Sequence, residues 1–234
     1  MNSFLNCERH TMKTLSITLI GLLFLGLTAA AKDTPATPPP TAETAPRYEM
    51  APTVFEGVNL ASTAKVGTTD LKAVSHGIRR KKVFGIATVD VYVAEFYALT
   101  PEKIQKSDDQ VLNSLSMAGP VQIKLTLKRE LSGSDISKSF KEALKENDVD
   151  LSKPVAGLSD LMTEVESIKS FKKGEVFAIS GDWSNNQQRI VIQRPDGSTK
   201  TITADDASLK KLFSMWLGKP VDDKMNDLKK NLLK

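Results

Sequence analysis

The sequence predicts an α+β domain in which helices lie against one face of a large antiparallel sheet. Three observations predict this class. Residues 83–97 are rich in β-branched and aromatic side chains, residues 176–203 hold three short strand-like runs, and amphipathic helix patterns stand on both sides of those runs. Strands joined by short turns form antiparallel hairpins, and a helix with one apolar face needs a sheet face to cover it.

The strand-like segments differ in pattern. Residues 83–97 (VFGIATVDVYVAEFY) predict one long strand or two consecutive strands. Over 121–129 apolar and polar side chains alternate, which predicts a strand with one face in water. A meander of three strands, with turns at Asn185-Asn186 and Asp196-Gly197, is predicted over 176–183, 189–194 and 199–203.

Apolar side chains three and four residues apart predict the helices. These segments are 134–146, 206–217 and 222–233. The Ser132–Asp135 stretch is typical of a helix start, and Gly218 with Pro220 is typical of a helix end. Their apolar faces predict a core between the helices and the sheet.

Composition excludes several classes of site. The chain is 40% hydrophobic and 26% charged, and its net charge of +4 gives no support to nucleic-acid binding. Cys7 and His10 fall in the first ten residues, so the body has no cysteine and one histidine, His76. A disulfide, a thiolate nucleophile and a histidine-rich metal site are therefore excluded there. We expect no metal and no cofactor.

The first residues predict export. A lysine, an apolar run of thirteen residues and an Ala-Ala-Ala end predict a signal peptide over 1–31, with Met12 as a possible true start. Six of the eleven prolines fall in the next segment, so 32–53 is predicted to be a flexible linker. Residues 54–234 predict one domain, with no membrane-spanning segment after signal removal. We expect a periplasmic or secreted protein.

The basic run 79–82 (RRKK) is the most conspicuous polar feature. It is either a solvated strand end or the source of one inward arginine that could hold a carboxylate or an enolate oxygen. Strand alternation would place Arg79 and Lys81 on one face, and Arg80 and Lys82 on the other. The residues alone do not decide which arginine is internal.

Few other side chains could do chemistry. Tyr92 and Tyr97 could donate a hydrogen bond to the same oxygen, although aromatic strand residues usually belong to the core. Asp90 could lie in a cleft, on an edge strand or at a bulge. His76 has no clear partner, and no nucleophile-elbow motif accompanies it.

Several short motifs, in their order, resemble the chalcone isomerase-like family. They are Ser75–Arg79 (SHGIR), Val91–Val93 (VYV), Gly119-Pro120, Arg129–Gly133 (RELSG) and Leu212–Gly218 (LFSMWLG), the last resembling secreted bacterial members. The resemblance covers roughly residues 54–233. It implies an open-faced β-sandwich, in which a large antiparallel sheet is backed by helices and a ligand cleft lies between them.

The resemblance also indicates what this chain lacks. The plant isomerases use an arginine, which falls on Arg79, and a threonine, which falls on Ala87 with Thr88 one place away. Their helix tyrosine, lysine and asparagine correspond to Ile136, Ser139 and Ala143 in this sequence. We therefore expect that this chain does not isomerise chalcones, although an isomerase of another kind stays open.

The fatty-acid-binding relatives pair the arginine with a strand tyrosine to hold a carboxylate, and Arg79 and Tyr92 match that pattern. On one unbroken strand these residues would face opposite sides, because their spacing is odd. Either a bulge or break, plausibly at Gly85, resets the alternation, or Arg80 is the inward residue. The predicted ligand-binding residues are Arg79, Tyr92, Arg80 and Thr88.

Three functions follow from these residues. The first is a non-catalytic binder of a fatty acid or similar amphipathic carboxylate, in a cleft between sheet and helices. The second is an isomerase or intramolecular lyase acting on another enolisable substrate, with Asp90 or His76 within reach of the arginine. The third is a structural envelope protein, with the arginine paired to an internal carboxylate and the cleft closed.

Overall fold

The structure is a computed structural model, and it describes residues 53–83, 87–153, 155–184 and 187–234. The predicted signal peptide and all but the last residue of the predicted linker lie outside these ranges, as do Gly85 and the Asn185-Asn186 turn.

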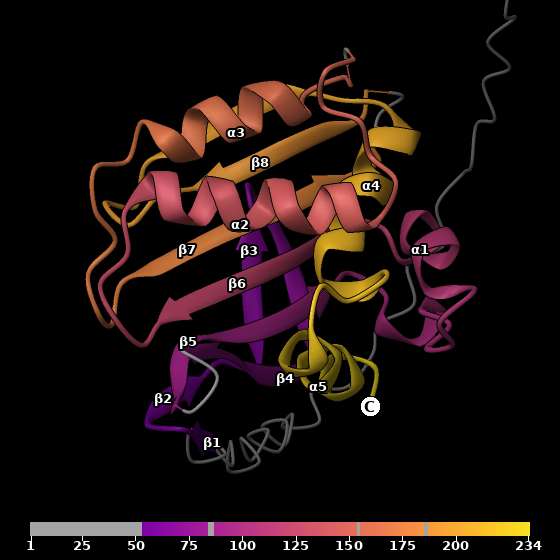
Figure 1. The fold of residues 1–234 in the computed structure, drawn as a ribbon. Helices are drawn as coiled ribbons and strands as arrows, with labels where there is room; N and C mark the ends of the chain where they lie inside the picture. Colours follow the sequence, from indigo (N-terminus) through magenta and orange to yellow (C-terminus); the bar gives the residue numbers. More distant parts are fainter. Residues whose placement is uncertain (1–52, 84–86, 154, 185–186) are drawn as a thin grey trace, which may run out of the picture. The chain divides into compact units, whose positions relative to one another are not determined.

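A seven-stranded antiparallel sheet forms the base of the domain (Figure 1). Its strands lie side by side in the order of the sequence, so every neighbour is reached without a crossover. They are β3 (Thr63–Val66), β4 (Thr69–Val83), β5 (Ala87–Ala98), β6 (Val121–Leu127), β7 (Val176–Asp182), β8 (Arg189–Gln193) and β9 (Thr199–Thr203). A separate hairpin consists of β1 (Thr53–Phe55) and β2 (Val58–Leu60).

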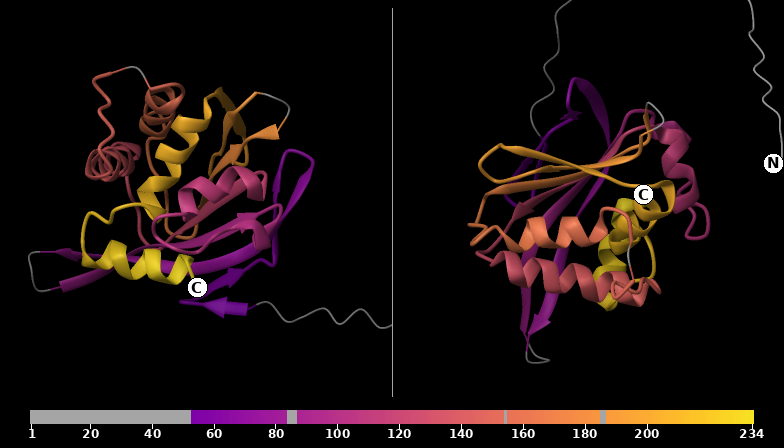
Figure 2. Two further views of the ribbon diagram at one scale, coloured as in Figure 1. Left: turned by 90° about the vertical axis from the view of Figure 1, so that its right-hand side faces the viewer. Right: turned by 90° about the horizontal axis from the view of Figure 1, so that it is seen from above.

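Helices cover one face of this sheet, as the views in Figures 1 and 2 agree. The helices are α1 (Val111–Ser114), α2 (Gly133–Glu146), α3 (Leu158–Glu166), α4 (Asp206–Leu217) and α5 (Asp223–Leu232), with two 3₁₀ turns at Pro101–Lys103 and Leu115–Ala118. Short α1 lies to one side of the others (Figure 1). The predicted α+β class, with helices backing one antiparallel sheet, is confirmed.

The core lies between the sheet and its helices. Phe96, Ile123 and Ile179 stand opposite one another on β5, β6 and β7, and all three are fully buried. Phe140 of α2 meets the ring of Trp216 of α4 edge-on, at 5.4 Å between ring centroids. Burial of these large apolar side chains is the main force that holds the helices to the sheet.

Side chains at the helix starts explain where the predicted helices begin. The hydroxyl of Ser132 accepts from the Asp135 N–H, and the Asp135 carboxylate accepts from the Ser132 N–H, which is a capping box. Asp205 and Asp222 cap α4 and α5 with their side chains, which accept from the Ser208 and Met225 N–H groups. The three predicted helices are confirmed within one or two residues.

Two elements escape the sequence pattern. Most of β4 is polar or charged, so its 15 residues lack the alternation that marks a half-buried strand. Helix α3 carries apolar side chains at the helical spacing, at Leu158, Leu161, Met162 and Val165, but the segment is only nine residues long. Strand β4 is ordered by its pairing with β3 and β5, and α3 by burial of its apolar face.

Candidate functional site

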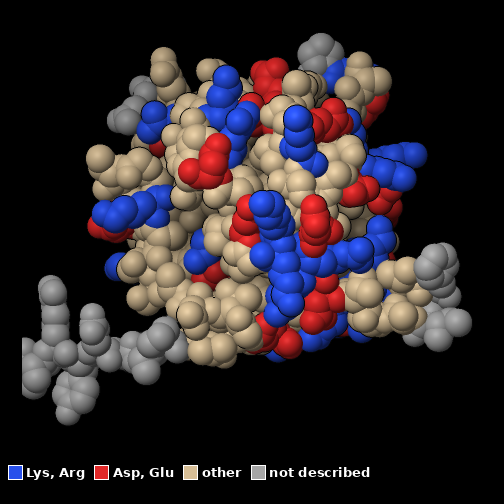
Figure 3. All heavy atoms as spheres, turned by 90° about the vertical axis from the view of Figure 1, so that its left-hand side faces the viewer, with Lys and Arg blue, Asp and Glu red and all other residues tan. Residues whose placement is uncertain are grey.

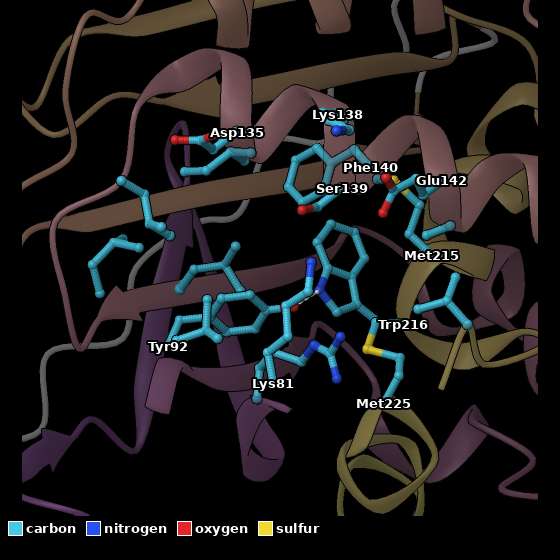
Figure 4. A pocket seen from close by; sticks show the side chains of 18 of the residues that line it. Lys81, Tyr92, Asp135, Lys138, Ser139, Phe140, Glu142, Met215, Trp216 and Met225 are labelled. Carbon is cyan, nitrogen blue, oxygen red and sulfur yellow. Dashed lines mark hydrogen bonds between the residues drawn. The ribbon is translucent and has the colours of Figure 1, made fainter. Parts of the chain in front are cut away.

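A cleft of about 480 Å³ opens between the sheet and the helices. Its walls come from β4, β5 and β6 on one side and from α2, α4 and the start of α5 on the other. Figure 4 shows the side chains that line it, with Tyr92 and Trp216 pointing toward one another. A volume of this size falls within the range of small-molecule sites, about 300–1,000 Å³.

The inner part of the cleft is apolar and its rim is charged. Buried side chains that line it include Leu125, Leu127, Ile136, Phe140, Ala143, Phe177, Met215, Trp216 and Met225. Exposed side chains at the rim are Lys81, Arg129, Asp135, Lys138 and Glu142. Lys81 extends from the sheet across the cleft toward Trp216 (Figure 4). An amphipathic molecule suits such a division of polarity.

Arg79 is the inward arginine. It is buried, at 8% exposure, and lines the cleft. Arg79 stands directly opposite Tyr92 in the β4–β5 pairing, so both side chains lie on the same face of the sheet. The structure therefore brings together the two residues that the family resemblance paired.

The alternation is reset at a different place from the one expected. Arg79 pairs with Tyr92, but Arg80 pairs with Asp90, so Val91 is an extra residue in β5. The bulge lies at Val91, whereas Gly85 is outside the described residues. Arg79 and Tyr92 lie on two different strands, so their odd spacing along the chain does not decide their faces. They share a face because they are direct partners in the β4–β5 pairing.

Asp222 already holds the Arg79 guanidinium. The two Nη atoms of Arg79 donate to Oδ1 and Oδ2 of Asp222 at 2.7 and 2.6 Å, and Nη1 also donates to the Arg80 carbonyl at 2.7 Å. Partial burial acts to raise the pKa of Asp222, but hydrogen bonds from Arg79 and from the Met225 N–H outweigh it, so the pKa lies below its ordinary value. The carboxylate is therefore charged at neutral pH, and the pair has no net charge.

Tyr92 has an unused hydrogen-bond donor. Its hydroxyl oxygen accepts from the indole Nε1–H of Trp216 at 3.2 Å (Figure 4). Within the described part of the chain, no group accepts the hydroxyl hydrogen of Tyr92. Burial raises the pKa of Tyr92, although nearby Arg79 acts to lower it, so the phenol keeps its proton at neutral pH. A ligand oxygen in the cleft could accept a hydrogen bond from this hydroxyl.

The remaining predicted residues lie elsewhere. Arg80 turns away from the cleft, because its Nε donates to Asp90 at 2.9 Å and its Nη2 to Glu56 at 2.8 Å. Thr88 stands opposite Lys82 and does not line the cleft; past the bulge, Val89 faces inward in its place. The register of β4 and β5 therefore directs Arg80 and Thr88 away from the cleft, unlike the placement predicted for them.

Neither of the acid–base candidates reaches the arginine. Asp90 is paired with Arg80, and His76 packs edge-on against Phe55 at 4.6 Å between ring centroids. Asp222 is the ionisable group that does reach Arg79, and the sequence showed it only as an acidic residue before a helix. Its importance to the cleft depends on α5 folding back onto β4, which no local pattern reveals.

The positions that replace the isomerase side chains do lie in the cleft. Ile136, Ser139 and Ala143 all line it from α2, spaced along one face of that helix. An apolar, a small polar and a methyl side chain there supply neither a phenol nor an amine. Among the residues of known placement, no cluster of histidine, cysteine and carboxylate side chains could hold a metal ion.

Comparisons with known proteins agree with this fold. A family model described as chalcone isomerase-like matches residues 52–234. A crystal structure of a fatty-acid binding protein of Arabidopsis thaliana is similar in fold, with a TM-score of 0.55 and 15% sequence identity, over 78% of this chain and 96% of that one. No curated protein matches the sequence. None of the described helices is long and apolar enough to cross a membrane.

Proposed function

The chain belongs to the chalcone isomerase-like family, and from this premise we propose that it binds a fatty acid or similar amphipathic carboxylate without transforming it. One observation carries the proposal: a cleft of about 480 Å³, apolar inside, holds a guanidinium and a free phenol donor at one place on its wall. The tail would lie among the buried side chains, and the carboxylate would bind Arg79 and Tyr92.

Burial of an alkyl chain supplies enough free energy for this role. About ten methylenes at roughly 0.8 kcal/mol each give on the order of 8 kcal/mol before ordering costs. After the entropic cost of association, a dissociation constant in the micromolar range is expected. The Arabidopsis fatty-acid binding protein of similar fold supports this ligand class.

Two features favour binding over catalysis. Ile136, Ser139 and Ala143 face the cleft where the plant isomerases have a tyrosine, a lysine and an asparagine, so the phenol, amine and amide of that set are absent at these positions. Neither Asp90 nor His76 reaches Arg79. A chemical step would need a proton acceptor or donor beside the substrate. The ionisable groups at Arg79 are Asp222, whose carboxylate is held by that arginine, and Tyr92, whose buried phenol keeps its proton.

The structure has one of the two features expected of a structural envelope protein. These features are an arginine paired to an internal carboxylate, which Asp222 supplies, and a closed cleft. The cleft is open, with a volume suited to a ligand. The binding role therefore accounts for more of the structure.

We further propose that the protein acts outside the cytoplasm. The basic residue, apolar run and small residues of 1–31 support export, and the proline-rich 32–53 would tether the domain. Comparing the mass of the mature protein, isolated from cell fractions, with the full-length sequence tests this. A mature protein that retains residues 1–31 would contradict it.

Delipidation, followed by titration with dodecanoate, tests the binding role. The wild-type domain should bind with micromolar affinity, and native mass spectrometry of undelipidated protein should show a bound amphiphile. Ala143→Phe, which fills the cleft, should weaken binding at least tenfold, because the ring occupies the space of several methylenes.

Ala207→Phe is the matched control, since Ala207 is an exposed residue of α4 that does not line the cleft. It should bind as wild type does. Arg79→Ala tests the polar end of the site, and an affinity for dodecanoate equal to that of wild type would remove Arg79 from the proposal. Absence of binding by a folded wild-type chain would overturn the function as a whole.

A further inference from the structure

The Arg79–Asp222 pair has the geometry that a bound carboxylate would have. Both Nη atoms of Arg79 meet the two oxygens of one carboxylate, which is the fork-to-fork arrangement that arginine makes with carboxylate ligands. Asp222 also lines the cleft. Resting on the proposed function, we propose that Asp222 is an internal competitor, which the carboxylate of the ligand displaces from Arg79.

The two partners differ in their access to water. The Arg79 side chain is 10% exposed, whereas that of Asp222 is 39% exposed. A buried guanidinium needs an anionic partner at all times, because an unpaired buried charge is strongly unfavourable. Asp222, in contrast, can turn toward solvent without being stranded. Exchange of one carboxylate for another is thus feasible at Arg79, with Asp222 as the group that leaves.

Asp222 keeps a second partner when it leaves. It is the N-cap of α5, and its Oδ1 accepts from the Met225 N–H at 2.7 Å. A capping side chain satisfies one of the free N–H groups of the first helical turn, so it retains a favourable position beside the helix N-terminus without Arg79. The exchange therefore does not require α5 to unfold.

Tyr92 gives the ligand an advantage over Asp222. Its hydroxyl hydrogen has no acceptor among the residues that the structure describes, and Tyr92 stands opposite Arg79 on the same sheet face. A ligand carboxylate on Arg79 gains this hydrogen bond and buries its tail, while Asp222 gains neither. Asp222, however, is tethered, which gives it a high effective concentration at Arg79. The balance sets how tightly a carboxylate binds.

Asp222→Asn separates the charge of this residue from its capping role. Asparagine caps helices as well as aspartate does, but it is a neutral and weaker partner for a guanidinium. Titration with dodecanoate should show binding at least tenfold tighter in Asp222→Asn than in wild type. Binding of 1-dodecanol, which has no charge to compete with Asp222, should change less than threefold.

Asp223→Asn is the matched control, because the neighbouring Asp223 makes the same charge change on an exposed side chain that does not line the cleft. It should bind dodecanoate as wild type does. Equal or weaker dodecanoate binding by a folded Asp222→Asn chain would overturn the inference, and so would an equal gain for dodecanol. In either case dodecanoate binding by wild type would leave the proposed function standing; no binding of dodecanoate or dodecanol by wild type would refute both.

A measurement on the wild-type chain avoids dependence on the folding of the variant. In ¹³C spectra, saturation with dodecanoate should shift the side-chain carboxyl resonance of Asp222, as its guanidinium partner is lost, and leave that of Asp223 in place. An Asp222 resonance that stays unchanged at saturation would contradict the exchange.

Discussion

The two faces of the sheet each bury a charge beside a tyrosine of β5, and they treat it differently. On the cleft face, Arg79 stands opposite Tyr92 and is held by Asp222 from α5. On the other face, Glu95 is 2% exposed, lies 2.8 Å from the Lys124 amine and accepts from the Tyr97 hydroxyl at 2.6 Å. The first charge borders a cleft, and the second is enclosed by its partners.

The tyrosines show the difference most clearly. Burial raises the pKa of Tyr97, as does its hydrogen bond to the Glu95 carboxylate, so its proton is already committed inside the protein. The proton of Tyr92 is uncommitted. The Ala61 N–H donates to Glu95 at 3.2 Å as well, which ties the segment before β3 to this cluster. The Glu95 cluster therefore leaves no tyrosine donor for a ligand, whereas the Arg79 cluster has one, which suits the exchange that we propose there.

Breaking the enclosed cluster should have the largest effect on stability. Lys124→Met removes the cation and leaves the Glu95 carboxylate buried without its ion pair. Loss of about 3–5 kcal/mol of unfolding free energy is expected. Chemical denaturation measures it, with Lys65→Met as control, since Lys65 pairs with Asp70 at an exposed site. Equal losses in both variants would remove the contrast between enclosed and exposed pairs.

A smaller loss is expected where α5 meets β4. A Cβ at Gly77 would lie 2.9 Å from Leu228 Cδ1 and 3.0 Å from Asn231 Cβ, so Gly77→Ala forces the helix outward. We expect a loss of about 1–3 kcal/mol, by the usual cost of overpacking. Hydrogen exchange should locate the loss in α5, with amides of α2 unaffected. Uniform loss of protection across both helices would show that α5 is not a separately held element.

The smallest effect concerns pH. Because the pKa of Asp222 is lowered in the folded chain, the stability it contributes is present above the ordinary carboxyl pKa, about 3.9, and is lost as pH falls through the folded value. The stability difference between wild type and Asp222→Asn should therefore shrink as pH falls from 6 to 3. A difference that is constant over this range, in urea titrations, would contradict the ion pair.

Much of the fold could be predicted because its helices and several strands follow local patterns of apolar and polar residues. The helix that begins after Ser132 and the meander toward Thr203 each carry their own signal. The alternation over 121–129 correctly predicts strand β6, but a face in water is wrong, because Gln122 and Thr126 on the polar face are buried. Strand β4 carries no such signal, since its polar residues are ordered by pairing with β5. Arg79 and Tyr92 were predicted from a resemblance, and the structure places them together.

The role of Asp222 at the cleft could not be predicted from the sequence alone. It lies 143 residues from Arg79 along the chain, and locally it reads as a helix cap. Its second role appears only when α5 packs against β4, where Leu228 and Asn231 approach Gly77. Long-range contacts of this kind decide whether a cation in a cleft is free or occupied, and no spacing rule encodes them.

Because Val91 is an extra residue in β5, deleting one residue there and inserting one residue there should affect this wall of the cleft differently. Losing Val91 would make the Arg79–Tyr92 and Arg80–Asp90 pairs consecutive rungs of a regular ladder, so every side chain would keep its side. Gaining one more residue while the bulge is kept would move Asp90 from Arg80 to Lys81 as its partner, and so turn it to the cleft face. Shortened variants should thus keep the apolar wall, whereas lengthened ones that keep the bulge should present Asp90 to the cleft.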